Sequence, residues 1–145
     1  MITDSNGIPL SVLIQPGNIS DQSLLFSNMD DMLTDITYNF KNNKHKRYML
    51  ADSIYDTRDI RDKIKSYNIV PIIWPNKRNT KNKELLKIKK LNSRHKKIYK
   101  KRIIIENTFS WIYKNRRTCK RYDKLVINYM SFLYMALIKI ILKRI

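Results

Sequence analysis

The chain is 145 residues long, which corresponds to one domain, and its 43% hydrophobic residues with only 2 Gly and 4 Pro exclude a disordered or collagen-like chain. A single cysteine, Cys119, excludes an internal disulfide framework and a cysteine-rich zinc site, so we expect a protein of the reducing cytoplasm. The formal net charge is +18, and 22 of the 30 basic residues lie in residues 76–145. This asymmetry favours a polyanionic partner, nucleic acid above all.

The first residues predict a β-hairpin. Residues 4–7 contain the Asn-Gly pair that is typical of a tight turn, and the β-prone run 8–14 follows them. Only residues 1–3 precede the turn, so we expect a hairpin whose first strand is missing or clipped. The Pro-Gly-Asn sequence at 16–18 ends the second strand.

Residues 20–74 predict alternating helices and strands. Ser20 or Asp21 can cap the first helix, because both side chains accept hydrogen bonds from free backbone N–H groups. Two short apolar runs separated by a helix favour the parallel pairing of two strands. The expected elements are a helix over about 22–40, a strand over 47–51 that delivers Asp52, a helix over about 58–67 capped by Thr57, and a strand over 69–74.

The rest of the sequence predicts a basic linker and two helices. Between Asn76 and Arg102 the chain has 13 basic residues and one acid, which is typical of a solvated segment, and we place the linker at about 76–95. Apolar spacing predicts a helix over 93–115 and a terminal core helix over about 125–142. This last segment is too short to span a bilayer, and a helix on a membrane surface is the weaker alternative. We therefore expect no membrane partner.

Two acidic residues stand out from their surroundings. Asp52 follows a predicted buried strand, and Glu106 is the only acid between Glu84 and Asp123. A carboxylate in apolar, basic surroundings is costly unless it is paired or binds a metal ion. Glu106 could pair with Arg102, four residues earlier, and Asp52 could be a turn residue at a strand end. Beside a polycation, the two together also fit phosphodiester chemistry, in which convergent carboxylates hold divalent ions.

Two motifs resemble those of bacterial insertion-sequence DDE transposases. Residues 50–56, Leu-Ala-Asp-Ser-Ile-Tyr-Asp, are similar to the Ala-Asp-x-Gly-Tyr-Asp signature around the second catalytic aspartate of that family. Residues 102–123 resemble its glutamate region, in the subgroup with Glu-x-Thr-Phe-x-Trp, then Arg-Arg and Arg-Tyr-acid. Residues 3–10 and 16–21 are similar to the hairpin turn and helix start of the same family. The resemblance thus covers nearly the whole chain.

The resemblance implies a ribonuclease-H-like α/β domain over residues 1–145 that cleaves and transfers DNA strands with Mg²⁺ or Mn²⁺. Asp52 and Glu106 are then catalytic residues and metal ligands. The implied partners are transposon ends and target DNA, which place the bound protein on the nucleoid, together with a second copy of the chain or an upstream transposase segment. The basic residues expected to bind DNA are Arg102, Lys114, Arg116, Arg117, Lys120 and Arg121.

The sequence departs from the family pattern in three places. Ser53 and Ile54 stand where the family usually has small or glycine residues. The family's first catalytic aspartate lies on a strand upstream of the turn that Asp4 occupies, so we expect an N-terminally truncated domain without its first strand. Tyr113 stands where many relatives carry a lysine, and Lys114 follows it. We therefore expect the chain to be inactive alone. It would be a partial or decayed copy of a transposase, or the product of a second reading frame that is joined to an upstream one by frameshifting. If the chain were active alone, Asp4 or Asp56 would be the first candidates for the third ligand.

Two other functions compete with the transposase. A non-enzymatic basic DNA-binding module would use its charge for binding and its acids for structure. A host or phage nuclease of the same fold is the third hypothesis. Replacement of Asp52 separates the first two functions, because a binding module would lose nothing whereas a metal site would lose affinity for divalent ions.

Overall fold

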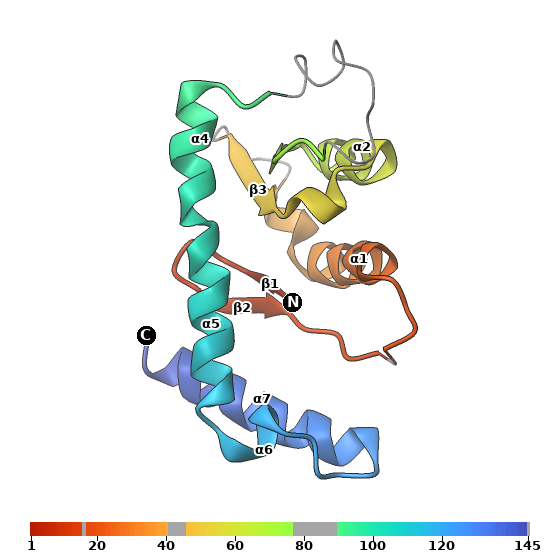
Figure 1. Cartoon of the computed structure of the whole chain (residues 1–145), viewed down its shortest axis with the longest axis vertical. Coiled ribbons are helices and arrows are strands. Elements are labelled where there is room, and N and C mark those ends of the chain that lie inside the picture. Colours follow the sequence, from red (N-terminus) through yellow and green to blue (C-terminus); the bar gives the residue numbers. More distant parts are fainter. Residues whose placement is uncertain (16, 41–45, 77–89, 145) are drawn as a thin grey trace.

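A long, interrupted helix runs along most of the molecule, and the other elements pack beside it (Figure 1). The sequence prediction of a mixed α/β class is confirmed, because the chain contains both helices and strands. Within the described residues the strands form two separate two-stranded sheets. The predicted linker at about 76–95 lies largely outside those residues. The computed structural model describes residues 1–15, 17–40, 46–76 and 90–144, with the backbone alone over 33–40.

The N-terminal hairpin consists of β1 (Ile2–Thr3) and β2 (Pro9–Ser11), which pair antiparallel. In the turn between them, the Asp4 carboxylate accepts hydrogen bonds from two backbone N–H groups, both 2.8 Å long. Gly7 has a φ of +81°, in the left-handed region that glycine adopts without strain. The predicted turn is confirmed. The second strand is shorter than the expected run 8–14, because β1 offers only two residues to pair with.

A helix–strand–helix–strand unit follows in the predicted order. β3 (Arg47–Ala51) and β4 (Ile69–Ile73) pair in parallel, and α2 (Arg58–Ser66) connects them. Thr57 caps α2, since its hydroxyl oxygen accepts a hydrogen bond from the N–H of Ile60 at 3.3 Å. The parallel pairing and the cap were both predicted from the sequence.

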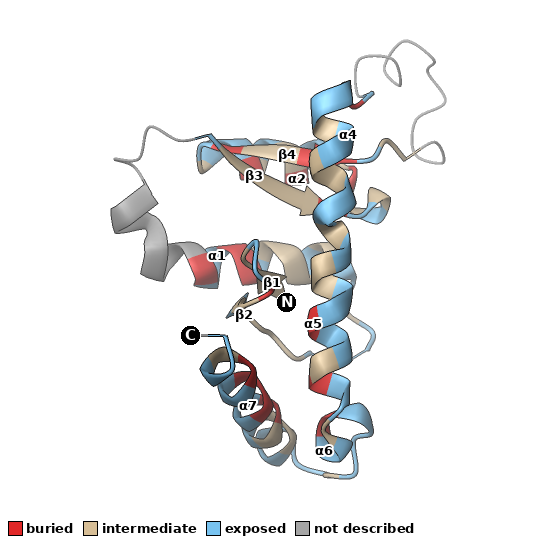
Figure 2. Cartoon of the chain, turned by 90° about the vertical axis from the view of Figure 1, so that its left-hand side faces the viewer, coloured by how far each residue is buried: buried red, intermediate tan, exposed pale blue. Residues whose placement is uncertain are grey.

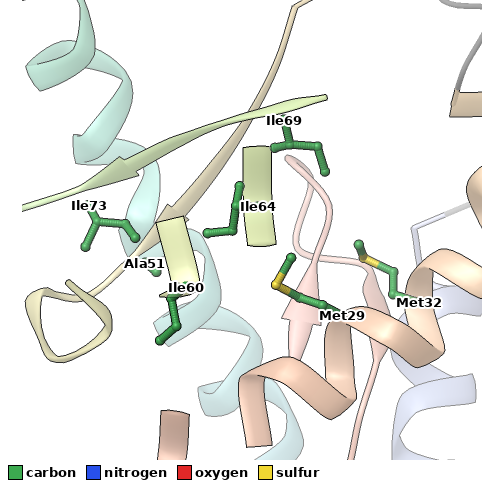
Figure 3. Packing of buried hydrophobic residues seen from close by; sticks show 7 residues of the cluster. All are labelled: Met29, Met32, Ala51, Ile60, Ile64, Ile69 and Ile73. Carbon is green, nitrogen blue, oxygen red and sulfur yellow. The ribbon is translucent and has the colours of Figure 1, made fainter. Parts of the chain in front are cut away.

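The first hydrophobic cluster lies where α1 (Asp21–Phe40) packs against this unit. α1 contributes Met29 and Met32, and α2 contributes Ile60 and Ile64 (Figure 3). Met29 and Ile64 are fully buried in this cluster. The strands complete the cluster with Ala51, Ile69 and Ile73. Because both ends of the strand pair are packed in this way, the position at which the chain leaves β3 is fixed.

The long helix is interrupted in the middle. α4 (Ser93–Tyr99) and α5 (Ile103–Tyr113) are joined by a 3₁₀ turn over Lys100–Arg102. The sequence prediction of one continuous helix over 93–115 is therefore wrong. Two pairs of lysines four residues apart repel each other across this junction, and three β-branched isoleucines follow it. Both features lower helix stability, and the tighter turn results.

The C-terminal part consists of α6 (Arg116–Cys119) and α7 (Val126–Leu142). α7 has nearly the predicted bounds and packs on Ile112 of α5 in a second hydrophobic cluster. It is a core helix on one face only, because its other face is exposed (Figure 2). No helix in the described part of the chain is long and apolar enough to cross a bilayer. The exposed apolar residues of α7 include Ile127, Tyr134, Met135, Ile138 and Leu142.

We expect Gly7→Ala to lower the free energy of unfolding by about 1–3 kcal/mol. A Cβ atom at this position would lie 2.8 Å from Oγ1 of Thr108 and 3.0 Å from the ring of Trp111, on a backbone with positive φ. Gly17→Ala is the matched control, because nothing lies within 4 Å of its added Cβ. Urea denaturation measures both variants. Equal losses in the two would contradict the tight packing of the hairpin turn against α5.

Candidate catalytic and DNA-binding site

Asp52 lies where β3 ends and the chain turns. Its Oδ1 accepts a hydrogen bond from the N–H of Ser53 at 2.6 Å and so caps a short 3₁₀ turn, Ser53–Tyr55. The side chain of Asp52 is nevertheless 55% exposed. Figure 2 shows the arrowhead of β3 ending beside the α4–α5 helix. Asp52 is thus a turn residue, as one interpretation of the sequence held, and also an accessible carboxylate.

Arg102 brings the two predicted acids together. Its Nη1 lies 3.9 Å from Oδ2 of Asp52, and its Nη2 lies 3.0 Å from Oε1 of Glu106. Two carboxylates that are 54 residues apart in the sequence therefore flank one guanidinium group. The Arg102–Glu106 contact is the intrahelical pair that the sequence allowed. Both acidic side chains are more than half exposed, so a cation or a DNA strand from solution can reach them.

A buried ion pair holds the chain segment that follows Asp52. The Asp56 side chain is fully buried, and its Oδ1 accepts a hydrogen bond from Nε of Arg61 at 2.7 Å. Its Oδ2 accepts a hydrogen bond from the N–H of Asn76 at 2.8 Å, and Arg61 also donates to the carbonyl oxygen of Ile73 at 3.0 Å. These contacts tie the turn after β3 to the end of β4. Asp56 therefore positions Asp52.

Sequence reasoning missed Tyr99, which lies beside the same cluster. Its ring packs on Trp74, with 5.8 Å between the ring centroids. Burial raises the pKa of the Tyr99 hydroxyl, while the charge of Arg102 lowers that pKa and the charge of Asp52 raises it. The pKa is raised overall, and the protonated hydroxyl can donate a hydrogen bond. Its spacing from Arg102 and Glu106, on one helical face, is the signal that could have found it.

The two carboxylates suit a divalent ion of the Mg²⁺ type. Mg²⁺ is commonly held by one or two carboxylates together with water and substrate phosphates. Asp52 and Glu106 meet this requirement, since they are accessible, lie on different elements and already flank a positive group. In the parts of the chain that the structure describes, no three His, Cys, Asp or Glu side chains are grouped to hold an ion. Asp4 and Asp56, the sequence candidates for a third ligand, are used by other contacts. Asp4 accepts hydrogen bonds within its own turn, and Asp56 accepts them from Arg61 and from the N–H of Asn76.

Two of the predicted DNA-binding residues lie at the two ends of α5, the helix that carries Glu106. Arg102 belongs to the 3₁₀ turn before α5, and Lys114 is the C-cap of α5. Lys114 is exposed and shares a shallow surface hollow with Glu106 and Tyr113. An extended phosphate chain can therefore contact both the acids and Lys114 along one side of α5.

The other predicted DNA-binding residues lie on or just after α6, away from β3 (Figures 1 and 2). Arg117 pairs with the Asp123 carboxylate at 3.7 Å. Arg121 donates hydrogen bonds to the backbone carbonyl oxygens of Asp123 and Lys124, at 3.0 and 3.1 Å. Both arginines thus stabilise the loop before α7. The structure does not bring this group to the acids. Arg116 and Lys120 are exposed, and the guanidinium of Arg116 lies 6.0 Å from the centroid of the Tyr122 ring in the same loop.

A mixed α/β domain with accessible acids beside a strongly basic helix has the features of a DNA-processing protein. Comparison with family models gives the particular family: residues 1–138 match the transposase DDE domain, and the chain belongs to that family. Membership implies DNA transposition as the general activity and a ribonuclease-H-like fold, as the sequence motifs indicated. Searches of curated proteins and of solved structures each find no significant match.

Proposed function

We propose that this chain provides two metal ligands, Asp52 and Glu106, for the cleavage of transposon ends and their transfer into target DNA. The observation that supports this most is the position of Arg102, since a positive group already lies between the two carboxylates. A divalent ion bound there would stabilise charge on the scissile phosphate and activate the attacking oxygen. Mg²⁺ or Mn²⁺ is the ion that the carboxylate ligands favour.

The chain's own side chains have separate tasks in this proposal. Asp52 and Glu106 bind the ion, and the Asp56–Arg61 pair keeps Asp52 at the end of β3. Arg102 leaves the acids when the ion enters and binds a phosphate of the DNA instead, for which its planar fork is well suited. Its side chain is 35% exposed, so this movement needs no unfolding of the helix.

We propose further that a third carboxylate completes the centre. Two carboxylates hold two ions poorly, and the family pattern places its first aspartate on a strand before the hairpin turn. On this proposal residues 1–145 tested alone show no divalent-dependent nicking of DNA, and a supplied segment with that strand and aspartate creates it.

A non-enzymatic DNA-binding module is the second candidate function. It is favoured by the contacts that the acids already make, since Asp52 caps a turn and Glu106 pairs with Arg102 within one helix. In such a module Arg102 would be the permanent partner of both acids. The Asp52→Asn variant separates the two functions, because only the metal site would lose affinity for divalent ions.

Both functions predict strong, salt-dependent and weakly sequence-selective DNA binding. Contacts to phosphates carry no direct information about the base sequence. Binding releases counterions from the DNA, and because this release is less favourable at high salt, the affinity falls as salt is added. With about six phosphate contacts, we expect the Kd to weaken about a thousandfold between roughly 50 and 200 mM salt. Titration of a labelled duplex at several salt concentrations measures this slope. A flat plot of log Kd against log salt would contradict both functions.

A further inference from the structure

A basic pocket lies between the C-terminal turn of α5 and the last turns of α7. Its volume is about 370 Å³, and Trp111, Asn115 and Ile140 form part of its wall. Trp111 and Ile140 also belong to the second hydrophobic cluster, so the wall is well supported. Of the described residues, four cationic ones and no acidic one line the pocket: Lys114, Lys139, Lys143 and Arg144.

Arg144 is already held in position in this pocket. Its guanidinium lies 3.7 Å from the centroid of the Trp111 ring and donates a hydrogen bond to the carbonyl oxygen of Asn6. Trp111 in turn packs closely beside Gly7 of the hairpin turn. An arginine fixed by stacking loses less conformational freedom when it binds a phosphate than a free side chain does. The pocket is therefore organised for an anion.

Within the described residues, none of the four cations of the pocket takes part in an ion pair. Among the described residues, the ion pairs involve other basic side chains. Arg117, by contrast, is used by the loop before α7, where it pairs with Asp123. Four like charges around one hollow repel each other, and a bound phosphate relieves that repulsion. The charge of the pocket thus fits a phosphate group.

The pocket continues the path that begins at the acids. Lys114 lines both this pocket and the hollow that contains Glu106. The eight residues from Glu106 to Lys114 span about 12 Å along α5 at 1.5 Å per residue. One DNA strand rises about 3.4 Å per nucleotide, so this distance corresponds to three or four nucleotides. A strand that has one phosphate at the acids can place another in the pocket.

We propose that this pocket binds a backbone phosphate of the DNA strand that lies across Asp52 and Glu106, about three or four nucleotides from the phosphate at the acids. The inference rests on the proposed function for the position of the acid-bound phosphate. The binding itself depends on Lys139, Lys143 and Arg144, which the sequence motifs did not assign to DNA. The pocket then fixes the register of the strand relative to the acids.

The test uses Trp111 as a reporter in the full chain. Trp74→Phe leaves Trp111 as the only tryptophan, and its emission is followed while a duplex oligonucleotide is added at fixed salt. We expect a saturable change in emission, and in Lys139→Gln/Lys143→Gln a Kd about tenfold weaker with a salt slope lower by about two. Lys96→Gln/Lys97→Gln is the matched control, since it removes two exposed charges from α4. It should keep the Trp111 signal.

Each outcome bears on the proposal. Lys114→Gln is a second pocket variant and should also weaken the signal. If DNA binds by anisotropy while Trp111 emission stays unchanged, or if the two lysine pairs behave alike, the pocket is not a DNA phosphate site and the proposed function is unaffected. If inorganic pyrophosphate saturates the signal and DNA does not compete with it, the ligand is a free phosphate compound and the proposal is overturned. If the parent chain binds no DNA, both proposals fail.

Discussion

Asp52→Asn and Glu106→Gln should each weaken Mn²⁺ binding by at least about tenfold, because loss of even a supporting partner of a metal ligand costs about 10–100-fold in affinity. Each change removes one of the two carboxylates that flank Arg102. The free Mn²⁺ signal in electron paramagnetic resonance, recorded during a titration, gives the affinity of each variant. The double variant should bind no Mn²⁺ at this position.

The control for the Mn²⁺ titration is Asp59→Asn. Asp59 is an exposed acid in the first turn of α2. Its replacement by Asn removes the same charge as the other two variants do, but at a distance from Arg102. We expect its Mn²⁺ affinity to equal that of the parent chain. If all three variants weakened binding equally, the ion would be held by the overall charge of the protein, and a shared site at Asp52 and Glu106 would be excluded.

Asp56→Asn should lower the free energy of unfolding by about 3–5 kcal/mol, which is the usual cost of leaving one partner of a buried ion pair alone. The Asp56 side chain is fully buried and that of Arg61 is 15% exposed, so the guanidinium would lose its carboxylate where water compensates little. The backbone N–H of Asn76 would lose a charged acceptor at the same time. Urea denaturation followed by circular dichroism measures the change.

Asp62→Asn is the matched control for the Asp56 variant. Asp62 pairs with Arg58 at 3.6 Å on the outside of α2, and both side chains are exposed. Exposed pairs contribute about 0–1 kcal/mol, so this variant should unfold almost as the parent does. Similar losses in the two variants would contradict the role of the Asp56–Arg61 pair in holding the segment after Asp52.

Features that depend on neighbouring residues were predictable from the sequence. The Thr57 cap and the Asn-Gly turn follow from local backbone chemistry, and the parallel pairing of β3 with β4 follows from two apolar runs separated by a helix. Asp52 and Glu106 were selected because a short motif surrounds each of them. These features could be predicted without knowledge of the fold.

Features that depend on distant contacts were not predictable. The spacing of Arg102 from Glu106 suggested their ion pair, but nothing local indicated that the same guanidinium reaches Asp52, 50 residues earlier. The use of Arg121 by backbone carbonyls also depends on how the loop before α7 folds back. The apolar pattern of α7 predicted burial, yet packing covers only one of its faces. In each case the contact or burial of the residue depends on a part of the chain that is brought to it only by folding.

Cleavage of the protein chain by bound iron tests most directly whether Asp52 and Glu106 share one ion. Fe²⁺ in place of Mg²⁺, with ascorbate and peroxide, generates radicals that cut the backbone close to the ion, and mass spectrometry of the fragments locates the cuts. A shared site predicts cuts near both Asp52 and Glu106, suppressed together by excess Mg²⁺ and by Asp52→Asn. Cuts near only one of the two residues, or cuts that persist in Asp52→Asn, would contradict it.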